Sequence, residues 1–216
     1  MLVLVITDLH GRYSYPREVK KELNCAELIV IAGDLTDFGG EREAETVLGG
    51  FSAYKDKLLA VNGNCDRHGV NKVLTDWGIN LTGDGRVVAG VGLFGLGGSG
   101  ITPFHTPQEL TEDELTGNLI AGWAKIENCR TRVLVSHPPP KDCKLDRTNS
   151  GAHAGSEAVR KFIDEHQPEL VACGHIHEAK GFDKIGKTIA INPGPFPYGY
   201  AWVEIAEKIT FRFSSP

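Results

Sequence analysis

Residues 2–10 read LVLVITDLH, a continuous apolar run that leads into Thr7, Asp8 and His10. Five consecutive apolar residues, as opposed to an alternating pattern, predict a strand that is buried on both faces. Strands of this kind belong to sheets that are covered on each side by helices or by a second sheet. The start of the chain therefore predicts an α/β protein, with a carboxylate and an imidazole at the end of its first strand.

Four further apolar runs end in polar residues in the same way. These residues are Gly33-Asp34 after 28–32, Asn62-Gly63-Asn64-Cys65-Asp66 after 58–61, Ser136-His137 after 133–135 and Gly174-His175-Ile176-His177 after 170–173. Ligands of open α/β sheets bind beyond the carboxyl ends of the strands. If the five strands are parallel neighbours, two Asp, one Asn and four His side chains meet at one edge. Such oxygen and imidazole ligands suit first-row transition metals and do not suit calcium.

The motifs that contain Gly63-Asn64 and Gly174-His175 carry most of this argument. The pattern G-N-x-D would occur by chance about 0.06 times in a chain of this composition, and G-H-x-H about 0.04 times. The triplet D-x-H would occur about 0.4 times, so Asp8 and His10 alone indicate little. The four histidines could instead be ordinary hydrogen-bonded residues, but their shared position after buried strands favours a metal site.

The segments between the strands predict helices at 16–24, 41–54, 67–77, 109–128 and 156–166. Thr111 and Glu114 offer a capping box near the start of the longest one. After residue 178 the pattern becomes rich in strands, and the last two, 199–206 and 208–213, alternate as in a hairpin. Alternating strands and helices with a strand-rich tail predict an α/β fold with mixed sheets. No linker or repeat interrupts the pattern, so we expect residues 1–216 to form one domain.

The composition excludes several classes of protein. An apolar fraction of 41% and a charged fraction of 24% are typical of globular proteins and exclude disordered and fibrous chains. No apolar run approaches the roughly 18 residues of a membrane span, and Asp8 comes too early for a signal peptide, so we expect a cytoplasmic protein. The net charge of −5 predicts no broad attraction to nucleic acid or anionic lipid. Five cysteines without a CxxC pair argue against a disulfide framework and a structural zinc site.

The ordered series Asp8-x-His10, Gly33-Asp34-x-x-Asp37, Gly63-Asn64-x-Asp66, His137 and Gly174-His175-x-His177 resembles the calcineurin-like metallophosphoesterase family. The resemblance spans residues 8–177 and implies a four-layer αββα sandwich, in which helices flank two mixed β-sheets. The segments around His137-Pro138-Pro139-Pro140, residues 151–156 and residues 174–178 resemble the small phosphodiesterase-like branch of that family.

The resemblance implies two divalent metal ions, with Mn²⁺ as the first choice and Fe, Zn, Ni or Co as alternatives. One ion would be held by Asp8, His10, Asp34 and His177, and the other by Asp34, Asn64, His137 and His175. Two ions bridged by a carboxylate can bind a phosphoryl group and supply a bridging hydroxide as the nucleophile. Asp37 and Asp66 would orient ligands by hydrogen bonds or form turns.

One position departs from the usual pattern of the family. A His that stabilises the transition state or protonates the leaving oxygen normally follows the Asn ligand, but here the residue is Cys65. A thiol is a weaker hydrogen-bond donor than an imidazolium, so we expect easy leaving groups or another donor, with His153 and His68 as candidates. The alternatives are a small apolar packing role for Cys65, a loop or capping role for His153 and no role in the chemistry for His68.

The implied function is a metal-dependent phosphoesterase with Asn64, Cys65 and His153 as catalytic residues. The substrate class is a small phosphodiester such as a cyclic nucleotide. The alternatives are a phosphomonoesterase or protein phosphatase of the same fold and a non-catalytic interaction scaffold, which would show gaps in the ligand set. We expect no membrane partner and no nucleic-acid polymer, and the sequence indicates no oligomeric state. The glycine-rich stretch 95–100 matches a dinucleotide fingerprint, but Pro103 and Pro107 prevent the helix that this motif requires.

Overall fold

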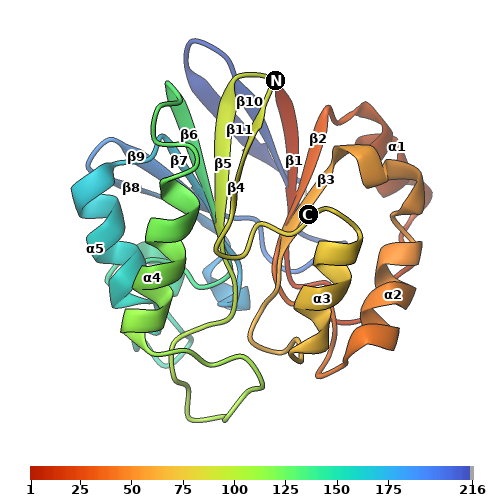
Figure 1. The fold of residues 1–216 in the computed structure, drawn as a ribbon, viewed down its shortest axis with the longest axis horizontal. Coiled ribbons are helices and arrows are strands. Elements are labelled where there is room, and N and C mark those ends of the chain that lie inside the picture. The colour runs from red at the N-terminus through yellow and green to blue at the C-terminus, as the bar shows by residue number, and fades with distance from the viewer. Residues whose placement is uncertain (215–216) are drawn as a thin grey trace.

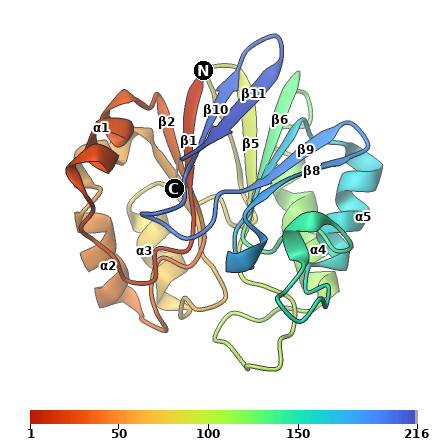
Figure 2. The same ribbon diagram turned by 180° about the vertical axis from the view of Figure 1, so that it is seen from behind.

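The computed structural model describes residues 1–214, which fold around two β-sheets packed face to face (Figure 1). The first sheet has five strands in the order β11-β10-β1-β2-β3. Their bounds are β1 Leu2–Ile6, β2 Leu28–Ala32, β3 Leu58–Val61, β10 Ala201–Ile205 and β11 Ile209–Phe213. Strands β1, β2 and β3 are parallel, whereas β10 runs antiparallel to β1 and forms the expected hairpin with β11 (Figure 2). The first sheet is therefore mixed.

The second sheet has six strands in the order β4-β5-β6-β7-β9-β8. Their bounds are β4 Gly85–Val88, β5 Val91–Leu96, β6 Thr131–Ser136, β7 Leu170–Ala172, β8 Gly181–Ile185 and β9 Thr188–Asn192. The four central strands are parallel, and the edge strands β4 and β8 pair with them in the antiparallel sense. This sheet is mixed as well.

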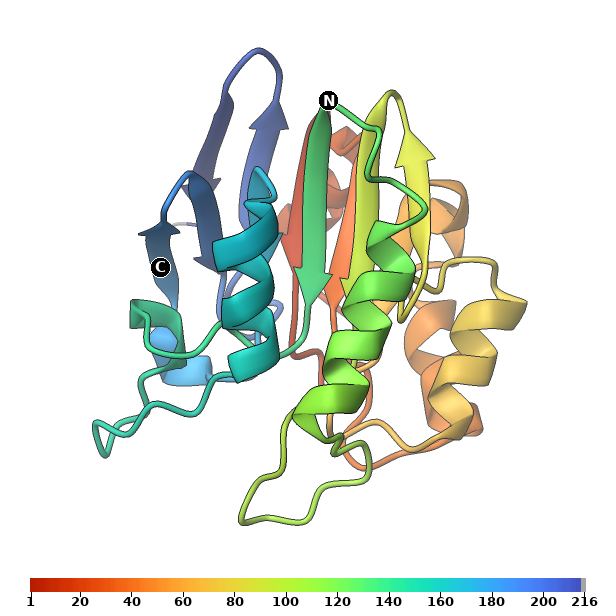
Figure 3. The same ribbon diagram turned by 60° about the vertical axis from the view of Figure 1, so that its left-hand side comes forward.

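Helices cover the outer face of each sheet (Figures 1 and 3). They are α1 Arg17–Cys25, α2 Glu41–Gly49 and α3 Gly69–Asp76 beside the first sheet, and α4 Glu112–Trp123 and α5 Glu157–His166 beside the second. Alternate residues of β1 face opposite ways. Leu4 and Ile6 pack in the cluster under α1–α3, whereas Val3 and Val5 pack between the two sheets. Both faces of the strand are therefore buried, as its sequence predicts, and the αββα sandwich is confirmed.

Two predicted helices differ from those in the structure. The helix predicted at 41–54 ends at Gly49, and a 3₁₀ helix, Ser52–Lys57, follows. Gly50 lies against the carbonyl oxygen of Tyr13, and this close approach leaves no space for a side chain. The helix predicted at 109–128 covers only Glu112–Trp123, because residues 109–111 belong to the preceding loop and residues 124–128 form turns.

The start of α4 confirms the predicted capping box. The hydroxyl of Thr111 accepts a hydrogen bond from the backbone N–H of Glu114, and the Glu114 carboxylate accepts one from the backbone N–H of Thr111. The remaining regular elements are two short 3₁₀ helices, Lys144–Asp146 and His177–Ala179. None of the helices within residues 1–214 combines the length and the apolar character that a membrane crossing would need.

Candidate metal centre

The carboxyl ends of the parallel strands of both sheets point to the same end of the molecule (Figure 3). The predicted ligands follow these strands directly: Asp8 and His10 after β1, Asp34 after β2, Asn64 after β3, His137 after β6, and His175 and His177 after β7. The structure therefore brings residues from five strands and two sheets to one place. This convergence is what the position of the motifs in the sequence predicts.

One group of these side chains lies between β1 and β7. The Nε2 atom of His177 is 3.4 Å from Oδ1 of Asp8 and 3.2 Å from Nε2 of His10. The Nε2 atom of His10 is 3.8 Å from Oδ2 of Asp34. Ligand atoms of Asp8, His10 and His177 all lie close enough to contact a single ion.

A second group lies on the other side of Asp34. The Nε2 atom of His137 is 2.8 Å from Oδ1 of Asn64 and 3.4 Å from Oδ1 of Asp34. The ring of His175 meets that of His137 edge to face, with 5.0 Å between the ring centroids. Asp34 thus has one carboxylate oxygen near each group of side chains, which is the arrangement that a bridging ligand requires.

The charges around Asp34 and Asp8 indicate that the site is built for cations. Both carboxylates are at most 2% exposed, and a buried carboxylate needs a compensating positive charge. Within residues 1–214 no Lys or Arg forms an ion pair with either of them, and the basic side chains within 4 Å of them are histidines. The chemistry of the donors, carboxylate and amide oxygens with imidazole nitrogens, matches divalent transition metals. The residues present therefore fit a pair of such ions.

His137 and Asp34 each shift the pKa of the other. Burial alone would raise the pKa of Asp34, but His137 holds it well below the usual range. Burial alone would lower the pKa of His137, but the Asp34 carboxylate raises it above the ordinary value. The Nδ1–H of His137 donates to the carbonyl oxygen of Ala32 at 2.9 Å, which directs Nε2 into the site. A proton on Nε2 would compensate the charge of the Asp34 carboxylate, and a cation held at this place would supply that compensation instead.

Local backbone geometry also singles out these residues. Asp8, His10, Asp34 and His175 have φ angles of 53°, 46°, 48° and 71°. Left-handed backbone is uncommon outside glycine and costs of order 1 kcal/mol or more per residue. Four of the seven predicted ligands adopt it, because the chain must turn sharply at the end of each strand to direct these side chains inward.

Two glycines of the predicted motifs leave room for the ligands themselves. A Cβ atom on Gly63 would overlap Oδ1 and the backbone nitrogen of Asp34. A Cβ atom on Gly174 would overlap the hydroxyl of Thr7 and would lie 2.7 Å from Oδ2 of Asp8. The G-N and G-H motifs therefore require glycine because neighbouring turns touch at these positions.

Asp66 supports the turns that carry the ligands. Its fully buried carboxylate accepts hydrogen bonds from the backbone N–H groups of Leu35, Thr36 and Gly63. Burial and the nearby charge of Asp34 raise the pKa of Asp66 to about 6. Asp66 thus ties the turn after β2 to the turn after β3. Asp37 is exposed and does not take part in this network.

Cys65 lies directly beside the candidate bridging residue. Its backbone N–H donates to Oδ1 of Asp34 at 2.9 Å, and its Sγ is 3.7 Å from Nδ2 of Asn64. Burial, with the charge of Asp34, raises the pKa of the Cys65 thiol above its ordinary value. The sulfur is therefore a protonated thiol at neutral pH in the ion-free protein and a weak donor.

His153 and His68 have different surroundings. His153 lines a cavity of about 1040 Å³ together with Asn64, Cys65 and His175. Its Nδ1 is 2.7 Å from Oδ1 of Asp146, which is fully buried. The Nδ1 atom of His68 instead lies 3.0 Å from Nε2 of Gln108, and His68 is not among the residues that line the cavity.

Asp146 is a residue that sequence reasoning missed. Its carboxylate also accepts hydrogen bonds from the backbone N–H groups of Asp142, Cys143 and Gly155. It therefore fixes both the loop and the imidazole ring of His153. The only sequence signal is a lone Asp seven residues before the His, and this signal does not distinguish Asp146 from any other loop carboxylate.

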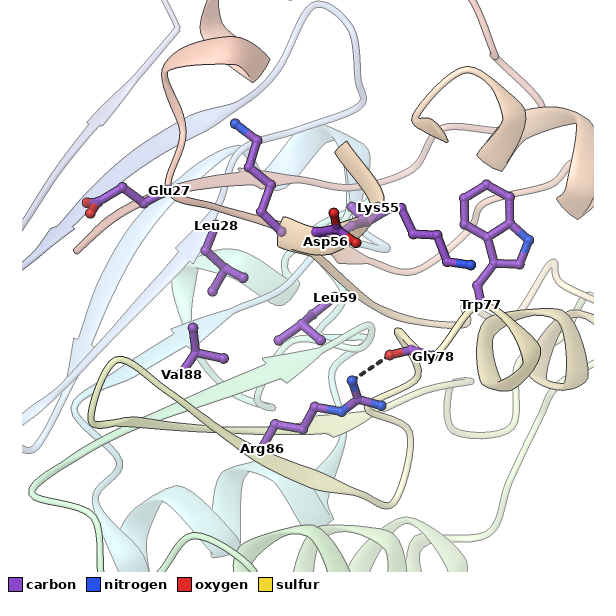
Figure 4. Close-up of a pocket in the computed structure, with 11 residues that line it drawn as sticks. Glu27, Leu28, Lys55, Asp56, Leu59, Trp77, Gly78, Arg86 and Val88 are labelled. Atoms are coloured by element: carbon purple, nitrogen blue, oxygen red, sulfur yellow. Dashed lines mark hydrogen bonds between the residues drawn. The ribbon is translucent and has the colours of Figure 1, made fainter. Parts of the chain in front are cut away.

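A smaller hollow, of about 270 Å³, lies at the amino ends of β2 and β3 (Figure 4). Leu28, Leu59 and Val88 form its apolar part, and Arg86 donates to the carbonyl oxygen of Gly78 at its edge. It contains none of the residues that the sequence analysis singles out. Its position at the far ends of the strands separates it from the candidate metal centre.

Comparison with known proteins decides the family. The sequence matches the family model for calcineurin-like phosphoesterases over residues 1–179. The chain belongs to this family. As a calcineurin-like phosphoesterase it is a metal-dependent hydrolase of phosphoric esters, which confirms the class of enzyme that the sequence predicts.

Relatives of this calcineurin-like phosphoesterase extend over most of its length. The uncharacterized protein MJ1162 of Methanocaldococcus jannaschii is 37% identical over 202 residues, covering 92% of this chain and 90% of that protein. The structure of TT1561 of Thermus thermophilus is similar at a TM-score of 0.70 and 16% identity, covering 98% of this chain and 97% of TT1561. A dimetal phosphatase from Danio rerio gives a TM-score of 0.68 and 14% identity, covering 98% and 95% of the two chains. At these identities, the two structures support the fold.

Proposed function

We propose that this protein hydrolyses small phosphodiesters, a cyclic nucleotide being the first to test, at a centre that holds two divalent ions. The observation that carries the proposal is the position of Asp34. One of its carboxylate oxygens is near His10, and the other is near His137. A carboxylate shared in this way offsets the mutual repulsion of two cations. The family membership supplies the general chemistry, and this geometry favours the dinuclear form.

The ligand sets follow from the two groups of side chains. Asp8, His10, Asp34 and His177 would hold one ion, and Asp34, Asn64, His137 and His175 would hold the other, with Mn²⁺ as the preferred metal. When bound, the pair supplies Lewis acidity toward the phosphoryl oxygens and a hydroxide nucleophile at neutral pH. The side chains of the protein position the ions, and the surrounding cavity positions the substrate.

The charges of the cavity favour a diester over a monoester. Lys141 is the one lysine among the residues that line the cavity, and its Nζ is 2.6 Å from Oε1 of Glu157. Glu112 and Glu178 line the same cavity and add negative charge. A monoester dianion meets more repulsion from these carboxylates than a diester monoanion does. The charges of these residues therefore support the proposed preference for phosphodiesters.

The experiment that tests this proposal compares two chromogenic substrates. The Mn²⁺-loaded protein should turn over bis(p-nitrophenyl) phosphate faster than p-nitrophenyl phosphate, measured as kcat/KM at pH 7.5. Protein treated with a chelator should lose both activities and regain them with added Mn²⁺. A kcat/KM for the monoester that is ten times that for the diester would establish the phosphomonoesterase alternative instead.

Leaving-group dependence tests the proposed roles of Cys65 and His153. We propose that His153, whose ring is held by Asp146, protonates the leaving oxygen in place of the missing His of the family pattern. Loss of a general acid costs about 10²–10⁴-fold in rate where protonation is needed. His153→Gln should therefore slow phenyl esters by about 100-fold and p-nitrophenyl esters by less than about threefold. Cys65→His should give its largest gain on the poorest leaving groups.

The controls separate this mechanism from general damage to the site. His68→Gln removes the other candidate donor and should leave the dependence on leaving group unchanged. Metal content and melting temperature, measured for each variant, should match those of the parent protein. Equal losses across the leaving-group series for His153→Gln, or equal gains for Cys65→His, would rule out proton donation as the function of these positions.

A further inference from the structure

The loop between β5 and α4, residues 97–111, projects beyond the carboxyl end of the second sheet (Figure 1). Its apolar residues Ile101 and Phe104 are 75% and 81% exposed. Both line the large cavity, as does Phe38 from the turn after β2, which is 48% exposed. Single exposed apolar side chains are common on protein surfaces, but three around one functional cavity form a surface for a ligand.

Hydrogen bonds hold this loop in a defined shape. Oε1 of Glu109 accepts from the hydroxyl of Thr102 at 2.5 Å, from the backbone N–H of Thr106 at 2.7 Å and from its hydroxyl at 2.9 Å. Partial burial opposes ionisation, but these hydrogen bonds lower the pKa of Glu109 to about 2, so it is a carboxylate at neutral pH. Two backbone hydrogen bonds, Ser99 N–H to Gln108 and Leu110 N–H to Ser99, close the base of the loop. These hydrogen bonds fix the conformation of the loop that carries Ile101 and Phe104, and a fixed loop loses less conformational entropy when a ligand binds.

Another part of the cavity lining is polar. It includes the hydroxyls of Thr148 and Ser150 and the carboxylates of Glu157 and Glu178. An alkyl chain would desolvate these groups without replacing their hydrogen bonds, and this desolvation is unfavourable. A flat aromatic group that carries its own donors and acceptors suits both kinds of lining residue, because its face can stack on Phe104 and its edge can hydrogen-bond to polar groups.

The size of the cavity agrees with a ligand larger than phosphate. A volume of about 1040 Å³ lies at the upper end of the roughly 300–1,000 Å³ found for pockets that bind small organic ligands. The candidate ligands His10, Asp34, Asn64, His175 and His177 line the same cavity. A phosphoryl group at the candidate metal centre and an attached organic group beside the loop therefore share one continuous space.

We propose that Phe38, Ile101 and Phe104 bind the base of a nucleotide whose phosphoryl group lies at the candidate metal centre. The placement of the phosphoryl group rests on the proposed function, whereas recognition of the base rests on the loop and its apolar side chains. The substrate class is thereby narrowed from small phosphodiesters to those that carry a nucleoside.

Binding of two probes tests this inference without relying on turnover. AMP and ribose 5-phosphate share the phosphorylated ribose and differ in the base. Calorimetry with Mn²⁺-loaded protein should give a dissociation constant for AMP about tenfold lower than that for ribose 5-phosphate, because only AMP carries a base that can stack on Phe104. Phe104→Ala should weaken AMP binding about tenfold and should change ribose 5-phosphate binding by less than about twofold.

Phe182 provides a matched control for Phe104→Ala. It is 54% exposed, lies on β8 and packs against Phe211, and it does not line the cavity. Phe182→Ala should leave the affinities for AMP and ribose 5-phosphate unchanged. Melting temperatures of both variants within a few degrees of the parent would show that neither result reflects unfolding.

Three outcomes would overturn the inference: equal affinity for AMP and ribose 5-phosphate, an unchanged AMP affinity in Phe104→Ala, or tighter binding of octyl phosphate than of AMP. The last would identify the loop as a site for an alkyl chain. These outcomes are separate from a failure of the proposed function. If the protein hydrolyses aryl diesters but binds AMP and ribose 5-phosphate equally well, only the inference about the base is refuted. If AMP binding depends on Phe104 but no diester is hydrolysed, only the proposed function is refuted.

Discussion

Asp34→Asn should abolish metal binding and phosphoesterase activity together. Asp34 has one carboxylate oxygen near each of the two groups of candidate ligands, and it is 2% exposed. The neutral amide removes the charge that would bridge the ions and leaves His137 without its carboxylate partner. We expect kcat/KM to fall at least about 1,000-fold, which corresponds to about 4 kcal/mol of transition-state stabilisation.

The measurement pairs elemental analysis with activity. Parent protein loaded with Mn²⁺ and desalted should retain about two ions per chain, and Asp34→Asn should retain fewer than one. Asp76→Asn, which alters an exposed carboxylate of α3 paired with Lys72, serves as the control and should match the parent in both respects. Two bound ions and parental kcat/KM in Asp34→Asn would show that Asp34 is not a bridging ligand.

Gly63→Ala should be nearly as damaging, although it adds only a methyl group. That methyl group would overlap Oδ1 and the backbone nitrogen of Asp34, and backbone atoms cannot move aside without shifting the turn after β2. Overpacking of a buried site costs about 1–3 kcal/mol in unfolding free energy. A displacement of about 1 Å at a catalytic group costs about 100-fold in rate, and we expect a loss of at least this size.

Gly117→Ala makes the same chemical change where there is space for it. Gly117 lies in α4, and nothing lies within 4 Å of the position that its Cβ would take. Alanine favours the helix over glycine by about 1 kcal/mol, so this variant should be slightly more stable than the parent and fully active. The measurements are the free energy of unfolding in urea and kcat/KM, compared between Gly63→Ala, Gly117→Ala and the parent protein. Equal behaviour of Gly63→Ala and Gly117→Ala would refute the steric explanation of the G-N motif.

The sequence predicted the strands that carry the site because their signal is local. Leu2–Ile6 and Leu28–Ala32 are continuous apolar runs, and such runs leave few alternatives to a strand covered on both faces. The candidate ligands could be predicted for a related reason. Each of them stands within five residues after a strand, and parallel strands bring their ends to one edge.

Other features depend on contacts between distant segments and could not be predicted in this way. The close approach of Gly50 to the carbonyl oxygen of Tyr13 joins two segments that lie far apart in the sequence. The hydrogen bond between His153 and Asp146 depends on the path of a loop with little regular structure. The presentation of Phe104 depends on hydrogen bonds of Glu109, and periodicity carries no signal for them.

The candidate ligands are divided between the two sheets. Asp8, Asp34 and Asn64 leave the first sheet, and His137 and His175 leave the second. An ion held by Asp34 and His137 would therefore link the two sheets, which also meet through an apolar layer and through hydrogen bonds such as that from Nδ1–H of His137 to the carbonyl oxygen of Ala32. Binding of such an ion would then stabilise the folded protein as well as support its activity. At a free ion concentration one hundred times the dissociation constant, this linkage adds about 2.7 kcal/mol to the free energy of unfolding.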